Sequence, residues 1–371
     1  MDKAYSHVEP NIRANSASEP RAWSHELVSY ETHFAYSELI KQATFGARVS
    51  ATWRFAVSLI PLLIKRLIRY EMIPLELRKA SSFDEKVGLA KIALKNMLRL
   101  GRRGSKTTRA ADDNEIARRL VSDGCAVATV SPSRFEELEK LAHPQFDALE
   151  KRRDASSRGQ TRAFDESRGS VDKRVAGEEL FRAIQSVFED AGVLSAVETY
   201  LGRPVRIVDV NPQINDSTDG FWREVFADLK IPSIPGAAYF HRDASGGDLK
   251  AIIYFTDVGP ENGPFTYVLG SNKMSVSKFD DLICEANDHN GLSSTDIAAR
   301  KSFAALPARL RQKCAFGNDV IDNSDLARWI GENSWSIEAP KGSIVLFDTK
   351  GVHRGGMVKT GQRRVITCVI G

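Results

Sequence analysis

The stretch KGSIVLFDTKGVHRGGMVKTGQRRVITCVIG, residues 341–371, contains two runs of β-branched and aromatic residues, at 343–347 and 365–370. Such runs, bounded by glycines and charged residues, are typical of short strands. Helical patterns occupy much of 276–331. The sequence therefore predicts a mainly β fold with helical support, either an antiparallel barrel or a jelly roll. Comparable strand-like runs lie at 205–210 and 250–258.

Upstream of most of these strands the pattern is helical. A helix is expected at 114–121, a short strand at Gly124–Val130, and a longer helix over 177–201, where Gly202 ends the apolar periodicity. Residues 150–175 are charged and rich in glycine and serine, which indicates a mobile loop.

Length and composition are those of an ordinary globular chain. It has 371 residues, 42% of them apolar and 27% charged, which excludes a collagen-like, a disulfide-scaffold or a wholly disordered protein. The four cysteines lie far apart without a C-x-x-C pair, so zinc ribbons and thioredoxin-like motifs are not expected. Together with an N-terminus that lacks the apolar core of a secretory signal, this favours a reducing compartment, the cytoplasm.

Charge divides the chain into two regions. Residues 1–111 contain 19 Lys and Arg against 10 Asp and Glu, a net charge of +9. Residues 112–371 contain 33 against 38, a net charge of −5. We therefore predict a basic, partly helical N-terminal extension over 1–111 and a separate main domain over 112–371.

Residues 51–70 (ATWRFAVSLIPLLIKRLIRY) predict an amphipathic helix, in which Pro61 would introduce a kink or a break. The longest uncharged run, 55–64, has 10 residues, about half of what a bilayer-spanning helix needs. Two interpretations remain, packing on the main domain or contact with a membrane surface. The linker 95–109 adds six cations, which could also attract anionic lipid. In the second interpretation, the protein therefore makes peripheral membrane contact through residues 51–109. The apolar positions are Trp53, Val57, Ile60, Ile64 and Leu67, with Arg54, Lys65, Arg66 and Arg69 at the two ends.

Histidine and aspartate supply a candidate metal site. His241 and Asp243 have the H-x-D spacing that places two donors on one side of a strand, because residues i and i+2 point the same way. The similar motif at 7–9 is expected by chance among seven histidines and 48 acidic residues. His353 follows a strand and a turn, and could return from the opposite sheet as the third ligand. Two imidazoles and one carboxylate on one octahedral face are the arrangement of non-haem Fe(II) oxygenases.

Arg363 and Arg364 follow His353 by ten and eleven residues and open the last predicted strand. An oxygenase that uses 2-oxoglutarate needs a guanidinium there to bind the far carboxylate as a bidentate pair. Side chains alternate along a strand, so only one of the two arginines can point inward. The other is then a solvated strand end.

From about residue 115 onward, the chain resembles the phytanoyl-CoA dioxygenase (PhyH)-like Fe(II)/2-oxoglutarate oxygenases. The resemblance depends on the order of several short motifs, none of which is specific by itself. It implies a double-stranded β-helix, that is, a jelly-roll or cupin-like core, and it leaves residues 1–111 unexplained. The motifs are Asp123-Gly124, YLGRPV (200–205), His241-x-Asp243, KAIIYFTDV (250–258), NGPF (262–265), Gly270-Ser271, GSIVLFD (342–348), His353-Arg354-Gly355 and Arg363-Arg364.

The resemblance implies the ligands of both cofactors, Fe(II) and 2-oxoglutarate. It assigns His241, Asp243 and His353 to the iron and a strand arginine to 2-oxoglutarate. The family's usual gap of eleven residues after the second histidine selects Arg364, whereas a turn one residue shorter selects Arg363.

Two further features follow from the resemblance. Phe255 stands where the family often has an aromatic residue beside the cosubstrate. The segment between the second and third metal ligands includes a helical insert near 272–335, which we expect to cover or shape the substrate pocket.

The implied function is a dioxygenase that hydroxylates an unactivated carbon of a small-molecule or lipid-linked substrate and releases succinate and CO2. In related halogenases a small residue replaces the iron-binding carboxylate, so Asp243 favours oxygen transfer. Desaturation and epimerisation are outcomes that the sequence does not separate from hydroxylation. The alternative is a catalytically silent or 2-oxoglutarate-independent metal-binding barrel that acts as a membrane-surface interaction module. No nucleic-acid partner is expected.

Overall fold

The computed structural model describes residues 39–69, 87, 114–156, 177–216, 240–243, 249–273, 297–311 and 325–371. The predicted linker at 95–109 and the predicted boundary between residues 111 and 112 lie outside this part of the chain.

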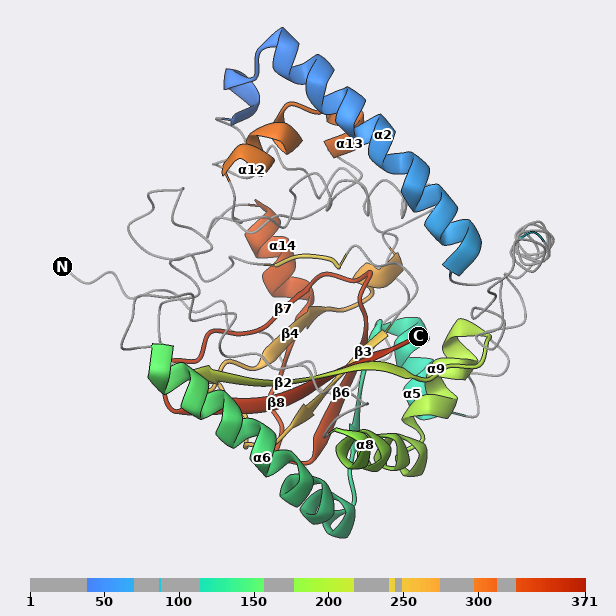
Figure 1. Ribbon diagram of the computed structural model, residues 1–371, viewed down its shortest axis with the longest axis vertical. Helices are drawn as coiled ribbons and strands as arrows, with labels where there is room; N and C mark the ends of the chain where they lie inside the picture. Colours follow the sequence, from blue (N-terminus) through green and yellow to red (C-terminus); the bar gives the residue numbers. More distant parts are fainter. Residues whose placement is uncertain are drawn as a thin grey trace.

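Five antiparallel strands form the larger of two sheets, in the order β1-β6-β3-β8-β2 (Figure 1). Strand β8 lies between β3 and β2 and pairs with both. The strands predicted near 125–130, 343–347 and 365–370 are confirmed. The one predicted at 250–258 ends at residue 254, and the one predicted at 205–210 extends to residue 216. The strands are β1 (Cys125–Thr129), β2 (Ile207–Asp216), β3 (Leu249–Tyr254), β6 (Ser343–Asp348) and β8 (Gln362–Ile370).

Three short strands form the smaller sheet, in the order β5-β4-β7. Side chains from both sheets meet in one buried cluster between them. Two antiparallel sheets with a shared core are the architecture of a jelly roll, so the predicted double-stranded β-helix is confirmed. The strands are β4 (Phe265–Val268), β5 (Ser334–Ile337) and β7 (His353–Arg354). The cluster includes Tyr254, Val345, Phe347 and Val365 from the larger sheet, and Phe265, Tyr267 and Ile337 from the smaller.

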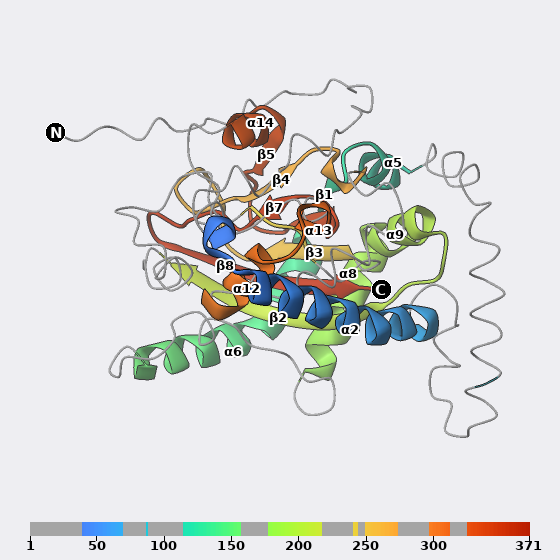
Figure 2. The same ribbon diagram turned by 90° about the horizontal axis from the view of Figure 1, so that it is seen from above.

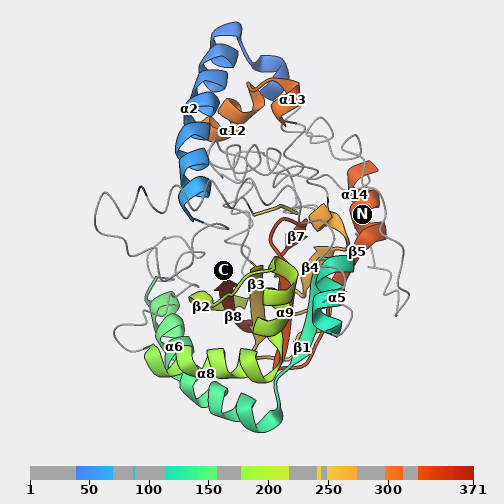
Figure 3. The same cartoon turned by 90° about the vertical axis from the view of Figure 1, so that its right-hand side faces the viewer.

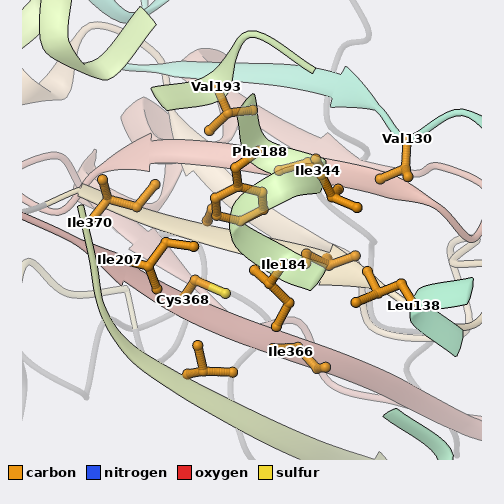
Figure 4. Packing of buried hydrophobic residues seen from close by; sticks show 14 of the residues in the cluster. Val130, Leu138, Ile184, Phe188, Val193, Ile207, Ile344, Ile366, Cys368 and Ile370 are labelled. Carbon is orange, nitrogen blue, oxygen red and sulfur yellow. The ribbon is translucent and has the colours of Figure 1, made fainter. Parts of the chain in front are cut away.

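The other face of the larger sheet is covered by helices. Apolar residues of α6 and α8 pack on alternate residues of β2, β3, β6 and β8, as Figure 4 shows for Ile184 and Phe188 beside Ile344, Ile366 and Cys368. Along a strand, the residues that contact the helices alternate with the residues of the inter-sheet cluster, because neighbouring side chains point to opposite faces of the sheet. The helices here are α5 (Glu115–Ser122), α6 (Pro132–Ser156), α8 (Glu178–Asp190) and α9 (Val193–Leu201).

Two of the helix predictions need correction. The helix predicted over 177–201 is divided into α8 and α9 by Gly192, which has a φ of 69°, a left-handed conformation that glycine adopts without a steric penalty. The loop predicted at 150–175 begins too early, because α6 continues to Ser156. The remainder of that loop, 157–176, lies outside the described residues.

Helix α2 (Phe45–Arg69) confirms the helix predicted at 51–70 and starts earlier than predicted. It continues through Pro61, so the proline does not divide it. One face of α2 packs on the region of α12 (Ile297–Ala304), which belongs to the insert, and Figure 2 shows the two helices side by side. Among the described residues, no helix is both long and apolar enough to span a bilayer.

The insert predicted near 272–335 is helical where the structure describes it. It contains α12, α13 (Ala308–Arg311) and α14 (Asp325–Asn333), followed by strand β5, whereas 274–296 and 312–324 lie outside the described residues. In Figures 1 and 3, α2, α12 and α13 lie at one end of the molecule, and α6 and α8 lie at the opposite end, with both sheets between them.

Candidate metal centre

Backbone hydrogen bonds bring the three predicted metal ligands together. His353 is the first residue of β7, and it exchanges two hydrogen bonds with His241, at 2.9 and 3.0 Å between nitrogen and oxygen. The Asp243 N–H donates to the Thr349 carbonyl oxygen at 3.0 Å, on the turn that precedes β7. The segment 240–243 is therefore attached at two points to the chain around His353.

The side chains converge as the backbone requires. His241 Nε2 lies 3.6 Å from Asp243 Oδ1, and His353 Nε2 lies 3.7 Å from Asp243 Oδ2. The three candidate ligand atoms all lie within 4.8 Å of one another. One metal ion could therefore contact all three, on one side of its coordination sphere.

The imidazole of His353 is oriented for this role. Its Nδ1 lies 2.9 Å from the Gly351 carbonyl oxygen, which can only accept, so Nδ1 carries the proton and Nε2 keeps its lone pair for a metal. The side chain is buried against the rings of Phe265, Tyr267 and Phe347. Burial lowers its pKa to about 3, although Asp243 opposes the shift, and the ring is therefore neutral at neutral pH.

Asp243 is held in its ionised form. Burial would raise its pKa, but the Lys250 ammonium and the two imidazoles hold the pKa well below the usual value for aspartate. Lys250 Nζ lies 2.6 Å from Asp243 Oδ2. Sequence reasoning missed Lys250, although it is a single cation within the apolar strand LKAIIY, where Leu249, Ala251 and Ile253 face the helices.

Replacing Lys250 by methionine is expected to weaken Fe(II) binding about 10- to 100-fold, the usual effect of removing an outer partner of a metal ligand. Methionine keeps an unbranched stem but cannot hold the Asp243 carboxylate. The measurement is an anaerobic Fe(II) titration, with Lys140→Met as the control, because Lys140 pairs with Glu136 on the exposed side of α6. Tighter binding by Lys250→Met would mean that Lys250 competes with the metal for the carboxylate instead of orienting it.

The two candidate arginines lie on opposite faces of β8. Arg364 points to the helical layer, as Ile366 and Cys368 do, and its Nη2 lies 2.5 Å from Glu150 Oε1 on α6. Arg363 has the parity of Val365, which belongs to the cluster between the sheets, and only 7% of it is exposed. The arginine that faces the space between the sheets is thus Arg363, the one that a turn shorter by one residue would select; which of the two binds 2-oxoglutarate stays a prediction.

The side chains of Arg363 and of its neighbour Asn215 each have a hydrogen-bond donor without a partner among the described residues. Within the described part of the chain the Nε of Arg363 has no hydrogen-bond partner, and Nη1 makes one long contact, 3.5 Å, with the Gly356 carbonyl oxygen. Asn215, its cross-strand partner on β2, also has a buried Nδ2 without a partner. A buried guanidinium beside an unused amide is an environment that favours a carboxylate ligand.

Arg363 also lies close to residues that follow a candidate metal ligand in the chain. Nη2 of Arg363 would lie 3.4 Å from a Cβ at Gly355, and Gly355 and Gly356 directly follow β7, which begins at His353. Asn215 was missed because the predicted strand ended at residue 210. The pattern that could have extended the predicted strand to Asn215 is the alternation of Asn211, Gln213 and Asn215 with apolar residues in β2.

Phe255 does not lie between the sheets. It packs on the helical side, with ring centroids 5.5 Å from Phe135 and 5.2 Å from Phe146. It points away from the inter-sheet cluster because it directly follows Tyr254, whose side chain points into that cluster. That Phe255 lies beside the cosubstrate stays a prediction, which this position does not support.

A model of one protein family matches most of the main domain. The family is phytanoyl-CoA dioxygenase (PhyH), and the match covers residues 123–366, which include all three candidate metal ligands and both arginines. No curated protein sequence matches the chain.

Solved structures resemble this fold at low sequence identity. AviO1 from Streptomyces viridochromogenes Tue57 is 14% identical, with a TM-score of 0.37, over 70% of this chain and 95% of AviO1. EctD from S. alaskensis, solved with 2-oxoglutarate and 5-hydroxyectoine, is 13% identical, with a TM-score of 0.39, over 69% of this chain and 74% of EctD. The epimerase SnoN, solved with Fe3+, alpha ketoglutarate and nogalamycin RO, is 14% identical, with a TM-score of 0.40, over 71% of this chain and 84% of SnoN. Because these TM-scores are below 0.5, the family assignment depends on the family model.

Proposed function

The chain belongs to the phytanoyl-CoA dioxygenase (PhyH) family of Fe(II)/2-oxoglutarate oxygenases, and from this premise we propose that it hydroxylates an unactivated carbon of a small-molecule substrate. Succinate and CO2 are the accompanying products. The observation that carries the proposal is the pairing of a His-Asp-His cluster with a buried, inward-facing arginine. The first suits a metal, and the second suits a dicarboxylate beside it.

The residues proposed to hold Fe(II) are His241, Asp243 and His353. Their chemistry fits the ion, since two imidazole nitrogens and one carboxylate are the ligand set that Fe(II) takes in non-haem oxygenases. When bound, the iron supplies the oxygen chemistry, while the protein positions the ligands and excludes water. The aromatic rings around His353 contribute to that exclusion.

The residue proposed to hold the far carboxylate of 2-oxoglutarate is Arg363, with Asn215 as an additional donor. A guanidinium offers two parallel N–H groups to a carboxylate, which fixes the orientation of the acid as well as its position. This feature favours the oxygenase over a metal-binding barrel that does not use 2-oxoglutarate, because such a barrel has no need for a buried, inward-facing arginine on the strand that follows its third ligand.

The proposal also concerns the substrate and the product of the reaction. A small molecule is the expected substrate class, and a lipid-linked one is the variant that the basic N-terminal extension favours. Hydroxylation, desaturation and epimerisation use the same protein residues, so the product distinguishes them. We place the enzyme in the cytoplasm, where Cys125 and Cys368, both buried, would stay free thiols.

Anaerobic addition of Fe(II) and then 2-oxoglutarate is expected to produce a weak visible absorption band. Neither addition alone should give it, because it requires the cosubstrate to bind to the metal. Exposure to oxygen should then yield succinate in proportion to the 2-oxoglutarate consumed, measured by mass spectrometry. Succinate without a requirement for Fe(II), or a protein that binds Fe(II) but shows no band, would contradict the proposed function.

Isotopic oxygen separates the outcomes once a substrate is found. Under 18O2, hydroxylation adds one heavy oxygen atom to the product, whereas desaturation and epimerisation add none. An unlabelled product would exclude hydroxylation as the reaction, while the assignment to the oxygenase family would remain.

A further inference from the structure

Helix α2 has two apolar faces, and within the described part of the chain only one of them is packed against other residues. Ala51, Phe55 and Leu62 are buried against residues 303–306 at the end of α12. This packing is the first of the two interpretations of the helix, and it involves one of its two apolar faces. The second face carries five large apolar residues, which are between 47% and 82% exposed: Phe45, Val49, Trp53, Val57 and Ile60.

The exposed residues form one continuous stripe. Phe45, Val49, Trp53 and Val57 follow one another at intervals of four, and Ile60 comes three later, so all five lie on one side of the helix. Among the described residues, seven large apolar side chains are exposed, and five of them are in this stripe. Single exposed apolar residues are ordinary, but a contiguous row indicates a surface that binds a partner.

Charge decides which partner fits. The sequence of α2 contains five cations, Arg48, Arg54, Lys65, Arg66 and Arg69, and no Asp or Glu. A second copy of the chain would place this basic helix against an equally basic one, and the like charges would repel each other. An anionic lipid surface offers both an apolar layer for the stripe and negative headgroups for the cations.

We propose that the stripe Phe45–Ile60 of α2 docks on the surface of an anionic lipid bilayer, with the helix parallel to the membrane plane. Trp53, 70% exposed at the middle of the stripe, is of the residue type that prefers the boundary between headgroups and acyl chains. The helix lies at the end of the molecule opposite α6 and α8 (Figure 3), so docking leaves the helical layer away from the membrane. This proposal is independent of the chemistry at the metal centre.

Vesicle flotation of the full-length protein tests the docking surface. The probes are vesicles of phosphatidylglycerol and phosphatidylcholine in equal amounts, and vesicles of phosphatidylcholine alone. We expect binding to the anionic vesicles, weak binding to the neutral ones, and a steep loss between about 0.1 and 1 M salt, where the screening length falls to roughly 3 Å.

Two variants and a matched control assign the binding to α2. Trp53→Ser with Ile60→Ser should weaken binding to anionic vesicles by about tenfold or more, because two apolar side chains no longer enter the interface. Arg54→Gln should weaken it about fivefold, the effect of one surface cation. Val208→Ser, which removes an exposed apolar residue from β2, should bind as the wild type does.

The same variants show what would overturn the proposal. A wild-type protein that ignores anionic vesicles contradicts it directly, as does an equal loss in Val208→Ser. A concentration-dependent dimer in light scattering that disappears in the Trp53→Ser/Ile60→Ser variant would identify the stripe as a contact between two copies. Thermal unfolding of each variant shows whether it is folded. If the double variant is unfolded, Arg54→Gln tests the docking surface by itself, because it leaves all apolar contacts in place.

Discussion

Alanine at His353 is expected to abolish Fe(II) binding at concentrations that saturate the wild type. The loss should exceed about 100-fold in affinity, because even the removal of an outer partner of a metal ligand costs 10- to 100-fold. The remaining His241 and Asp243 would hold the ion at two points only, in the part of the site with access to water, since both are half-buried while His353 is 4% exposed. Anaerobic equilibrium dialysis with Fe(II) measures the effect, and Mn(II) serves as a second ion that resists oxidation.

The control for His353→Ala is His143→Ala. His143 lies on α6, exposed, where its Nδ1 pairs with Asp147 at 3.0 Å, so its loss should leave metal binding unchanged. Alanine at His241 or Asp243 should behave as His353→Ala does. A variant of any of the three that keeps the wild-type affinity would remove that residue from the ligand set, and equal losses in His143→Ala would indicate general unfolding.

Leucine at Arg363 is expected to raise the 2-oxoglutarate concentration needed for half-maximal succinate formation by about 30- to 1,000-fold. Removing one partner of a buried charge pair costs on the order of 2–4 kcal/mol, since the other charge is left unpaired. Leucine at Arg364 should change this concentration less than fivefold, because the pair with Glu150 is about 30% exposed on both sides and such pairs contribute roughly 0–1 kcal/mol.

Two further measurements make the comparison of the arginines specific. Fe(II) binding should be unchanged in both variants, since neither arginine is a metal ligand. Arg363→Lys should recover only part of the 2-oxoglutarate affinity, because an ammonium keeps the charge but not the two parallel N–H groups. If Arg364→Leu has the larger effect, the inward-facing arginine is not the cosubstrate ligand, and the orphaned Arg363 Nε has another partner.

The metal cluster could be predicted from sequence because the patterns that indicate it lie within short stretches of the chain. The H-x-D spacing places two donors side by side, and the third follows a strand and a turn that are visible as patterns. The choice between Arg363 and Arg364 could not be made in this way, because it depends on which face of β8 meets the other sheet. Val365 and Ile366 are equally apolar, and only packing shows that the first faces the smaller sheet and the second faces the helices.

Much of the jelly roll could likewise be predicted, but its shortest strands could not. Strands β4 and β5 have four residues each, and β7 has two, which is too few for a period to be recognised. They are strands because Thr266 and Tyr267 pair with partners on both sides. Lys250 was missed for a related reason, because its role depends on Asp243, which reaches it from a separate segment.

In the larger sheet, no two strands among the described residues are paired locally. Its nearest paired residues along the chain, Ile253 and Ile344, are 91 positions apart, and Cys125 and Phe347 are 222 positions apart. Among the described strands, β2 lies at the edge and pairs with β8 alone, so during synthesis it emerges from the ribosome long before this partner exists. Folding of such a high-contact-order sheet is slow, and unpaired strands of the nascent chain are open to aggregation in the meantime. Yield of native enzyme should therefore depend on chaperones and on growth temperature more than on the stability of the finished fold.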